Sequence, residues 1–148
     1  MRVVVQRVKR ASVEIEEKIV GQIGRGVLVL LGIAKDDTVN DIQWMLDKIT
    51  NLRIFENENG KLDKSLMDIS GELLVVSQFT LYGDCSKGRR PSFTGAMDPK
   101  EAKNLFELFI ERAREKVEKV ESGIFQASMD VSLINEGPVT LIIDNKKL

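Results

Sequence analysis

The chain has 148 residues, of which 43% are hydrophobic, and its formal net charge at pH 7 is −1. This length predicts one domain over residues 1–148 with enough apolar side chains to bury a core. Histidine is absent and Cys85 is the single cysteine, which excludes Ser-His-Asp and Cys-His catalytic sites, histidine-ligated metals and an intrachain disulfide. We therefore expect no metal or other cofactor, and any catalysis must use hydroxyls, amides, backbone dipoles, carboxylates or the substrate itself.

The balance of charges limits the partners and the location that the sequence predicts. Proteins that coat duplex nucleic acid usually carry a basic excess, which this chain lacks, so any nucleic-acid contact is expected to be local. The lone cysteine favours a reducing, cytoplasmic setting. Residues 1–7 lack the long apolar region of a signal peptide, and no apolar run has the length of a membrane span, so no membrane partner is expected.

The N-terminal quarter of the chain predicts four β-strands in antiparallel meander order. Strand patterns occupy residues 2–8, 11–16, 19–23 and 27–33, and the second and third form a hairpin around Glu17-Lys18. The fourth is apolar throughout, as expected of a strand that is buried on both faces.

An amphipathic helix and a short hairpin are predicted next. Thr38 followed by Asp41 fits a capping box. The residues after it repeat an apolar side chain at helical spacing: Ile42, Met45, Leu46, Ile49 and Leu52. A short strand over residues 52–56 precedes the turn dipeptide Asn59-Gly60, and residues 65–69 form the candidate returning strand.

The rest of the chain is organised around residues 73–84. The apolar start of this stretch predicts a strand buried on both faces, which then runs into Ser77, Gln78 and Thr80. A polar group taken out of water without a partner costs roughly 1–3 kcal/mol. These side chains are therefore either satisfied within their own turn or presented to a ligand, and the pattern alone leaves both interpretations open.

A loop, a second helix and two strands complete the chain. The loop holds a basic cluster that is either solvated or in contact with phosphate groups: Lys87, Arg89 and Arg90. Asp98-Pro99 predicts a helix start, because Asp is a good cap and proline suits the first turn. Residues 124–135 then alternate as a strand that places Phe125 and Met129 on one face. A polar interruption separates this strand from the last one, over residues 141–143.

Two polar interruptions of apolar strands closely resemble the signature motifs of the D-aminoacyl-tRNA deacylases, formerly called D-tyrosyl-tRNA deacylases. The family's Ser-Gln-x-Thr-Leu motif matches residues 77–81, and its Asn-x-Gly-Pro-Val-Thr motif matches residues 135–140. The resemblance runs from end to end and includes residues 1–8, 51–55 and 87–93. Each motif alone is moderately specific, whereas both together, in this order and spacing, are highly specific.

The resemblance implies an α+β single domain in which a mixed or antiparallel sheet curls into a barrel with two helices packed outside. It also implies a homodimer with active sites at the subunit interface, and aminoacyl-tRNA bound through its 3′ end. The implied activity is that of a carboxylic ester hydrolase, which releases free D-amino acid and tRNA from D-aminoacyl-tRNA in the chiral proofreading of translation. Family members can also act on glycyl-tRNA, so glycine mischarged on tRNA(Ala) is an expected substrate.

The resemblance also implies how the site selects its substrate. In the family, the Gly-Pro peptide is cis and enters the active site of the partner subunit. Gly137 and Pro138 would thus set main-chain carbonyls against the substrate α-amino group and exclude an L side chain, while Arg7 stands where the family has the arginine that holds this loop. The expected site residues fall into three groups: catalytic Ser77, Gln78, Phe79, Thr80 and Thr140; substrate-binding Gly137, Pro138, Asn135, Met129, Phe125 and Arg7; and tRNA-binding Lys87, Arg89 and Arg90.

The absence of histidine limits the mechanism. Ser77, Thr80 and Thr140 are the candidate nucleophiles, but an unassisted hydroxyl is a poor nucleophile at neutral pH. We prefer a placed water, assisted by the ribose 2′-hydroxyl and by backbone N–H donors around Phe79 that contribute ~2.7–4 kcal/mol each. Two alternatives stay open: a non-catalytic RNA-binding module that stacks bases on Phe79, and a thiol enzyme that uses Cys85.

Overall fold

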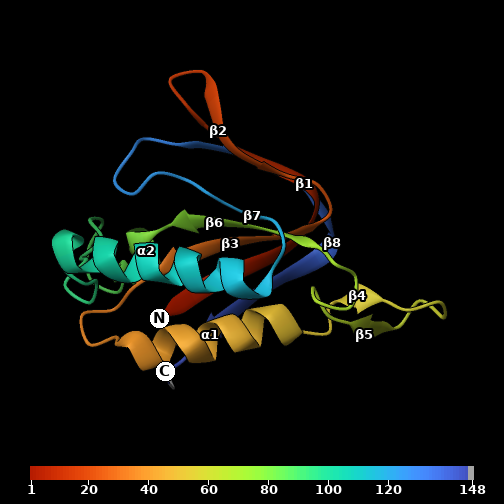
Figure 1. Cartoon of the computed structure of the whole chain (residues 1–148). Coiled ribbons are helices and arrows are strands. Elements are labelled where there is room, and N and C mark those ends of the chain that lie inside the picture. Colours follow the sequence, from red (N-terminus) through yellow and green to blue (C-terminus); the bar gives the residue numbers. More distant parts are fainter. Residues whose placement is uncertain (147–148) are drawn as a thin grey trace.

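The long strand β1 (Arg2–Ile15) is the element on which the sheet is assembled, as Figure 1 shows for the computed structural model, which describes residues 1–146. Its first half pairs with β3 (Gly26–Gly32) and its second half with β2 (Lys18–Ile23). Its opposite edge pairs with β8 (Asp130–Asp144), and all three pairings are antiparallel. One strand thus joins the N-terminal hairpin, the barrel wall and the C-terminal strand.

The predicted division of residues 2–8 and 11–16 into two strands is wrong, because β1 runs through both. Lys9 and Arg10 are both exposed, which interrupts the alternation of buried and exposed residues without ending the pairing. The register to β8 shifts on either side of Val8, so irregularities in the ladder absorb the change of phase. The N-terminal region therefore contains three strands instead of the four in meander order.

The sheet continues through parallel strands that the meander prediction does not include. β6 (Glu72–Ser77) pairs in parallel with β3 and with β7 (Val120–Ser122), a strand that the sequence pattern did not reveal. A parallel neighbour needs a crossover connection, and α1 (Val39–Asn51) and α2 (Pro99–Lys116) supply the two crossovers. Figure 1 shows both helices side by side on the outside of the sheet. The expected α+β fold, a mixed sheet curled into a nearly closed barrel with two helices outside, is confirmed.

Two apolar clusters cover the two faces of β6. Leu73 and Val75 belong to the larger cluster, which includes the buried residues of both helices, such as Phe109. Leu74 and Val76 belong to the second cluster, within the curled half of the sheet formed with β1 and β2. The prediction that this strand is buried on both faces is therefore confirmed.

Both helices begin where the sequence predicts. The backbone N–H of Thr38 donates to the carboxylate of Asp41 at 2.6 Å, as a capping box requires. The carboxylate of Asp98 accepts a hydrogen bond from the N–H of Lys100 at 3.0 Å, and Pro99 occupies the first helical position. Within residues 1–146, neither helix combines the length and the apolar composition that crossing a membrane requires.

The predicted hairpin around Asn59-Gly60 is present, but its second strand begins earlier than expected. It consists of β4 (Phe55–Glu56) and β5 (Leu62–Lys64) and projects from the side of the domain (Figure 1). The predicted strand over residues 65–69 is wrong, because the carboxylate of Asp68 accepts hydrogen bonds from both the N–H and the hydroxyl of Ser65 at 2.8 Å. Such local bonding competes with a strand ladder and forms a turn instead.

The parallel contact between β3 and β6 leaves no room for a side chain at Gly26. A Cβ atom there would overlap the backbone oxygen of Glu72 and lie 2.7 Å from its backbone nitrogen and carbonyl carbon. We expect Gly26→Ala to lower the free energy of unfolding by about 3 kcal/mol, measured by urea titration, because backbone cannot yield as a flexible side chain can.

Gly24→Ala is the matched control for this prediction. The nearest neighbour of a Cβ at Gly24 is the Glu72 carboxylate at 3.7 Å, which is ordinary van der Waals contact. We expect this variant to change the free energy of unfolding by less than about 1 kcal/mol. Equal losses in the two variants would contradict the steric argument.

Candidate functional site

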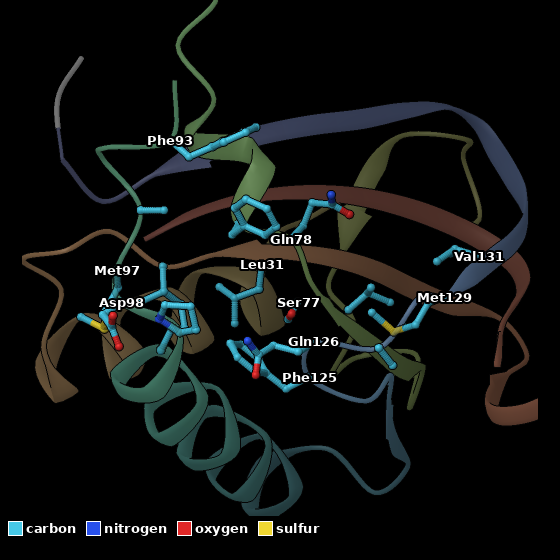
Figure 2. A pocket seen from close by; sticks show the side chains of 17 residues that line it. Leu31, Ser77, Gln78, Phe93, Met97, Asp98, Phe125, Gln126, Met129 and Val131 are labelled. Carbon is cyan, nitrogen blue, oxygen red and sulfur yellow. The ribbon is translucent and has the colours of Figure 1, made fainter. Parts of the chain in front are cut away.

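A pocket of about 720 Å³ opens where the parallel strands β3 and β6 end. Its walls come from these strand ends, the 3-10 turn η1 (Phe79–Tyr82), the start of α2 and residues 125–131. Parallel strands leave a crevice at their carboxyl ends, so the position of the pocket follows from the β3–β6 pairing. Figure 2 labels the principal lining residues: Leu31, Ser77, Gln78, Phe93, Met97, Asp98, Phe125, Gln126, Met129 and Val131.

The polar end of the central stretch turns instead of continuing as a strand to Thr80. β6 ends at Ser77, and η1 is closed by a hydrogen bond from the N–H of Leu81 to the carbonyl of Gln78 at 3.2 Å. The turn packs closely on Gly32, where a Cβ atom would lie 3.1 Å from the Gln78 carbonyl oxygen. Glycine at this position therefore allows the close approach that bends the chain.

Three of the five predicted catalytic residues line the pocket: Ser77, Gln78 and Phe79. Thr80 is not among the lining residues, and its hydroxyl accepts a hydrogen bond from the side-chain amide of Gln78. The polar groups are thus divided between the two interpretations that the sequence left open. The side-chain N–H of Gln78 and the hydroxyl of Thr80 satisfy each other within the turn. Ser77 and Gln78 also line the pocket, where they are available to a ligand.

An aromatic pair forms part of the pocket wall. Phe79 is 58% exposed, although it is a large apolar residue, and its ring meets the edge of Phe93 with 5.0 Å between centroids. Phe93 lies directly after the basic loop and was not predicted as a site residue. The one sequence feature that could have indicated Phe93 as a site residue is its position directly after that loop.

The opposite wall of the pocket is a turn and not the predicted strand over residues 124–135. β8 begins only at Asp130, and Phe125 and Met129 line the pocket from the segment before it. Gln126 has a φ of 65°, in the left-handed region that is uncommon for residues other than glycine. Figure 2 shows its amide beside Phe125 among the lining side chains, a placement that no sequence pattern indicated.

Residues 136–139, here called the Gly-Pro excursion, leave the ladder between β1 and β8. The ladder pairs that flank it are Asn135 with Val8 and Thr140 with Gln6. Four residues of β8 therefore oppose a single residue of β1, Arg7. Gly137 and Pro138 lie exposed at the middle of the excursion, and the peptide bond between them is cis.

The predicted site residues of this segment lie outside the pocket of their own chain: Asn135, Gly137, Pro138 and Thr140. The side-chain amide of Asn135 donates to the carbonyl of Val139 at 3.0 Å, and the amide of Gln6 donates to the Thr140 hydroxyl at 3.3 Å. These hydrogen bonds brace the base of the excursion.

Arg7 anchors the excursion to the segment before β4. Its side chain is buried, with 5% of the residue exposed. Its Nε donates to the carbonyl of Glu136 at 2.7 Å, and its Nη1 donates to the carbonyl of Ile54 at 2.7 Å. The guanidinium thus satisfies the carbonyl of Glu136, which the excursion takes out of the regular ladder, together with the carbonyl of Ile54.

The basic loop lies on the surface beside the pocket. Lys87, Arg89 and Arg90 are exposed, and the loop is closed at its base by two backbone hydrogen bonds between Asp84 and Ser92. Hydrogen bonds from the hydroxyl and N–H of Ser86 hold the pKa of the Asp84 carboxyl below its usual value. The loop therefore presents cations close to Phe93, without contributing a basic residue to the lining itself.

The described lining residues limit the chemistry of the pocket. Asp98 is the only ionisable side chain among them, and within residues 1–146 no group of three or more His, Cys, Asp or Glu side chains is placed to hold a metal. At the end of η1, burial and then the nearby Asp37 and Asp144 raise the pKa of Tyr82, so that its phenol stays neutral. The pocket can bind an apolar, planar group and polarise a carbonyl through amide and N–H dipoles.

Comparison with known proteins gives a consistent result. The family model described as D-Tyr-tRNA(Tyr) deacylase matches residues 4–144. D-aminoacyl-tRNA deacylases of Thermotoga petrophila and Clostridium tetani are 58% and 59% identical over 148 residues, covering 100% of this chain and 99% of each relative. Among solved structures, a c-Myc DNA unwinding element binding protein has a TM-score of 0.94 and 43% identity, over 99% of this chain and 100% of that chain. A probable eukaryotic D-amino acid tRNA deacylase, with a TM-score of 0.83, 20% identity and coverage of 96% and 97%, shares the fold.

Arg7→Ala should destabilise the protein, because the carbonyls of Glu136 and Ile54 lose a charged donor. Hydrogen bonds to charged groups contribute about 1.5–3 kcal/mol, so we expect the free energy of unfolding in urea to fall by about 3 kcal/mol. Arg7→Lys should lose an intermediate amount, since an ammonium lacks the planar fork. The control is Arg10→Ala, at an exposed position of the same strand, with an expected change below about 0.5 kcal/mol. Equal losses for Arg7→Ala and Arg10→Ala would refute the anchoring role.

Proposed function

The chain belongs to the D-Tyr-tRNA(Tyr) deacylase family, and we propose that the pocket at the end of β6 is its active site. The chain hydrolyses the ester that joins a D-amino acid to the terminal adenosine of tRNA, and it releases the free amino acid and the tRNA. The observation that carries the assignment to this pocket is the placement of residues 77–81. This first signature motif delivers a hydroxyl, an amide and an aromatic ring to one cavity wall.

The size and lining of the pocket support binding of the terminal adenosine together with the aminoacyl group. Phe125 and Met129 offer an aromatic ring and a polarisable thioether, against which a purine can stack. Ser77 and Gln78 on the opposite wall offer the hydrogen-bonding groups that orient a ligand in a mostly apolar pocket.

Hydrolysis by a water molecule fits the groups that are present. The water oxygen bonds to the ester carbonyl carbon, the bond from that carbon to the ribose oxygen breaks, and the ribose oxygen takes a proton. Backbone N–H groups around Phe79 and Thr80 would stabilise the developing oxyanion, at ~2.7–4 kcal/mol for each donor. The ribose 2′-hydroxyl beside the ester would assist the water. The bond from Gln78 to the Thr80 hydroxyl supports this assignment, because a neutral amide cannot act as a base for a threonine nucleophile.

We propose further that the protein is a homodimer in which the Gly-Pro excursion of one chain enters the pocket of its partner. Gly137 and Pro138 at the middle of the excursion are exposed, and the whole excursion lies outside the pocket of its own chain. β8 pairs only with β1 among the described strands, and it exposes 39% of Leu141 and 71% of Ile142. Apolar residues on a strand with an open edge form a surface suited to a second chain.

In this arrangement the excursion would select substrates by shape. Its main-chain carbonyls would face the α-ammonium group and leave no space for an L side chain. A steric wall rejects a competitor more strongly than the loss of a hydrophobic contact does. Glycine has no side chain to reject, so the same wall would admit glycyl-tRNA.

The basic loop would contact phosphates near the 3′ end of the tRNA. Lys87, Arg89 and Arg90 are exposed beside the pocket in a chain whose formal net charge is −1, which supports a local contact. The same balanced charge gives no support to extensive DNA binding by this chain, although one related solved structure is named a c-Myc DNA unwinding element binding protein. The alternative is a non-catalytic RNA-binding module, and an activity assay distinguishes it from a hydrolase.

Incubation with D-tyrosyl-, L-tyrosyl- and glycyl-tRNA tests the proposed function. We expect release of D-tyrosine and glycine, while the L-tyrosyl ester persists at its uncatalysed rate. An intact D-tyrosyl ester would identify a binding module instead. Loss of activity on alkylation of Cys85 would indicate a thiol enzyme.

The same assay distinguishes water from a threonine nucleophile. Thr80→Ala and Thr140→Ala should each retain D-tyrosyl-tRNA hydrolysis within about tenfold, since neither hydroxyl forms a bond to the substrate. Thr94→Ala, an exposed threonine outside both motifs, is the control. An acyl-enzyme trapped on Thr80 or Thr140 would refute the mechanism.

Mixed dimers test the shared active site. Ala127→Arg would fill the pocket, and Gly137→Phe would cover the tip of the excursion, so we expect each variant alone to be inactive. Co-refolding them in equal amounts should restore about one quarter of the wild-type activity, because half of the dimers are mixed and each has one intact site. No recovery would show that pocket and excursion do not meet across an interface.

A further inference from the structure

We propose that Arg25 and Glu136 form an ion pair that positions the Gly-Pro excursion for selection between D and L substrates. This inference rests on the proposed function, in which the excursion acts within the substrate site. It concerns Glu136, the residue directly before Gly137. Arg7 already holds the main-chain carbonyl of Glu136. The second arginine acts on the side chain of the same residue.

The ion pair has two points of contact. Arg25 Nε and Nη2 donate to the two carboxylate oxygens of Glu136, at 3.2 Å and 3.4 Å respectively. The guanidinium also lies over the ring of the buried Phe55, 5.4 Å from its centroid. A planar guanidinium that is both stacked and paired at two points has little freedom to rotate.

The backbone of Arg25 is fixed as well. Its carbonyl accepts a hydrogen bond from the N–H of Glu72 at 3.1 Å, at the start of the strand that leads to the pocket. The preceding N–H, of Gly24, donates to the carboxylate of Glu72 at 2.6 Å. The ion pair therefore connects the excursion to a rigid part of the sheet.

Two arginines thus restrain different atoms of Glu136, and both arginines contact the same segment, residues 54 and 55. Arg7 joins its carbonyl to the carbonyl of Ile54, and Arg25 joins its carboxylate to the ring of Phe55. If only the carbonyl of Glu136 were held, its side chain would be free to rotate and would place no restraint on the residue. Fixing both ends sets the direction in which the chain continues into Gly137.

The exposure of the pair argues for positioning more than for stability. The side chains of Arg25 and Glu136 are 50% and 25% exposed, and ion pairs in contact with water contribute little to folding. A displacement of about 1 Å in a selecting group, in contrast, can change a rate about a hundredfold. Loss of the pair should therefore affect catalysis and selectivity far more than melting.

The test measures kcat and KM of the full chain for D-tyrosyl-tRNA and the rate for L-tyrosyl-tRNA. We expect Arg25→Ala and Glu136→Gln each to lower kcat for the D substrate about tenfold and the ratio of D to L hydrolysis at least as much, with KM within about twofold. The melting temperature should fall by less than about 4 °C. Arg25→Lys keeps the charge without the fork, so it should recover part of the lost kcat.

The double variant and a matched pair complete the experiment. Arg25→Ala/Glu136→Gln should be no worse than either single variant, because all three lose the same interaction. Arg53→Ala and Asp63→Asn remove an exposed arginine–aspartate pair, 3.4 Å apart, at the neighbouring hairpin, and should leave kcat unchanged.

A wild-type kcat and D/L ratio in Arg25→Ala would overturn the positioning role, and so would additive losses in the double variant or an equal loss in the Arg53 control. Failure of the proposed function is distinguishable from these outcomes. In that case the wild-type chain itself leaves the D-tyrosyl ester intact, and the positioning role is overturned with it.

Discussion

The pocket depends on one constraint, the insertion of β6 between two parallel neighbours. The backbone of β6 lies so close to Gly26 that the first pair of the β3–β6 ladder excludes a side chain. Parallel pairing ends both strands at one edge and requires a crossover helix on each side of β6. The second crossover brings the start of α2 to that same edge. Floor and wall of the pocket are therefore consequences of a single pairing.

The parts of the fold that the sequence predicts are those with local signals. The apolar run of β6, the cap at Thr38, the Asp98-Pro99 start and the Asn59-Gly60 turn each act within a few residues. β7 carries no such signal, because it has three residues and owes its strand geometry to pairing with the distant β6. The continuity of β1 was missed for a related reason. Its two adjacent charged residues break the local pattern, but the pairing to β8 holds the strand together.

The candidate site could be predicted only where a sequence motif marks its residues. Ser77, Gln78 and Thr80 could be selected because polar residues at the end of a buried strand are unusual, and Phe79 because it lies within the same motif. Of these four residues, Ser77, Gln78 and Phe79 line the pocket and Thr80 does not. Phe93 and Gln126 could not be selected in this way, since their convergence depends on how a loop and a turn pack against β6. The placement of the second motif outside the pocket follows from a departure in the ladder, which alternation of apolar residues does not encode.

The way the excursion is built separates the folding of the sheet from the proposed selection of substrates, two properties that usually change together. The ladder resumes on both sides of residues 136–139, so the register of the sheet is set outside them, and only Val139 among them belongs to the buried core. Arg7 grips a main-chain carbonyl, a group that every amino acid carries. The exposed tip of the segment is in this sense separable from the contacts that anchor it. In the proposed role, substitutions at the exposed Gly137 and Pro138 would alter discrimination while folding is retained, which would leave evolution, or a protein engineer, room to change the stereochemical preference.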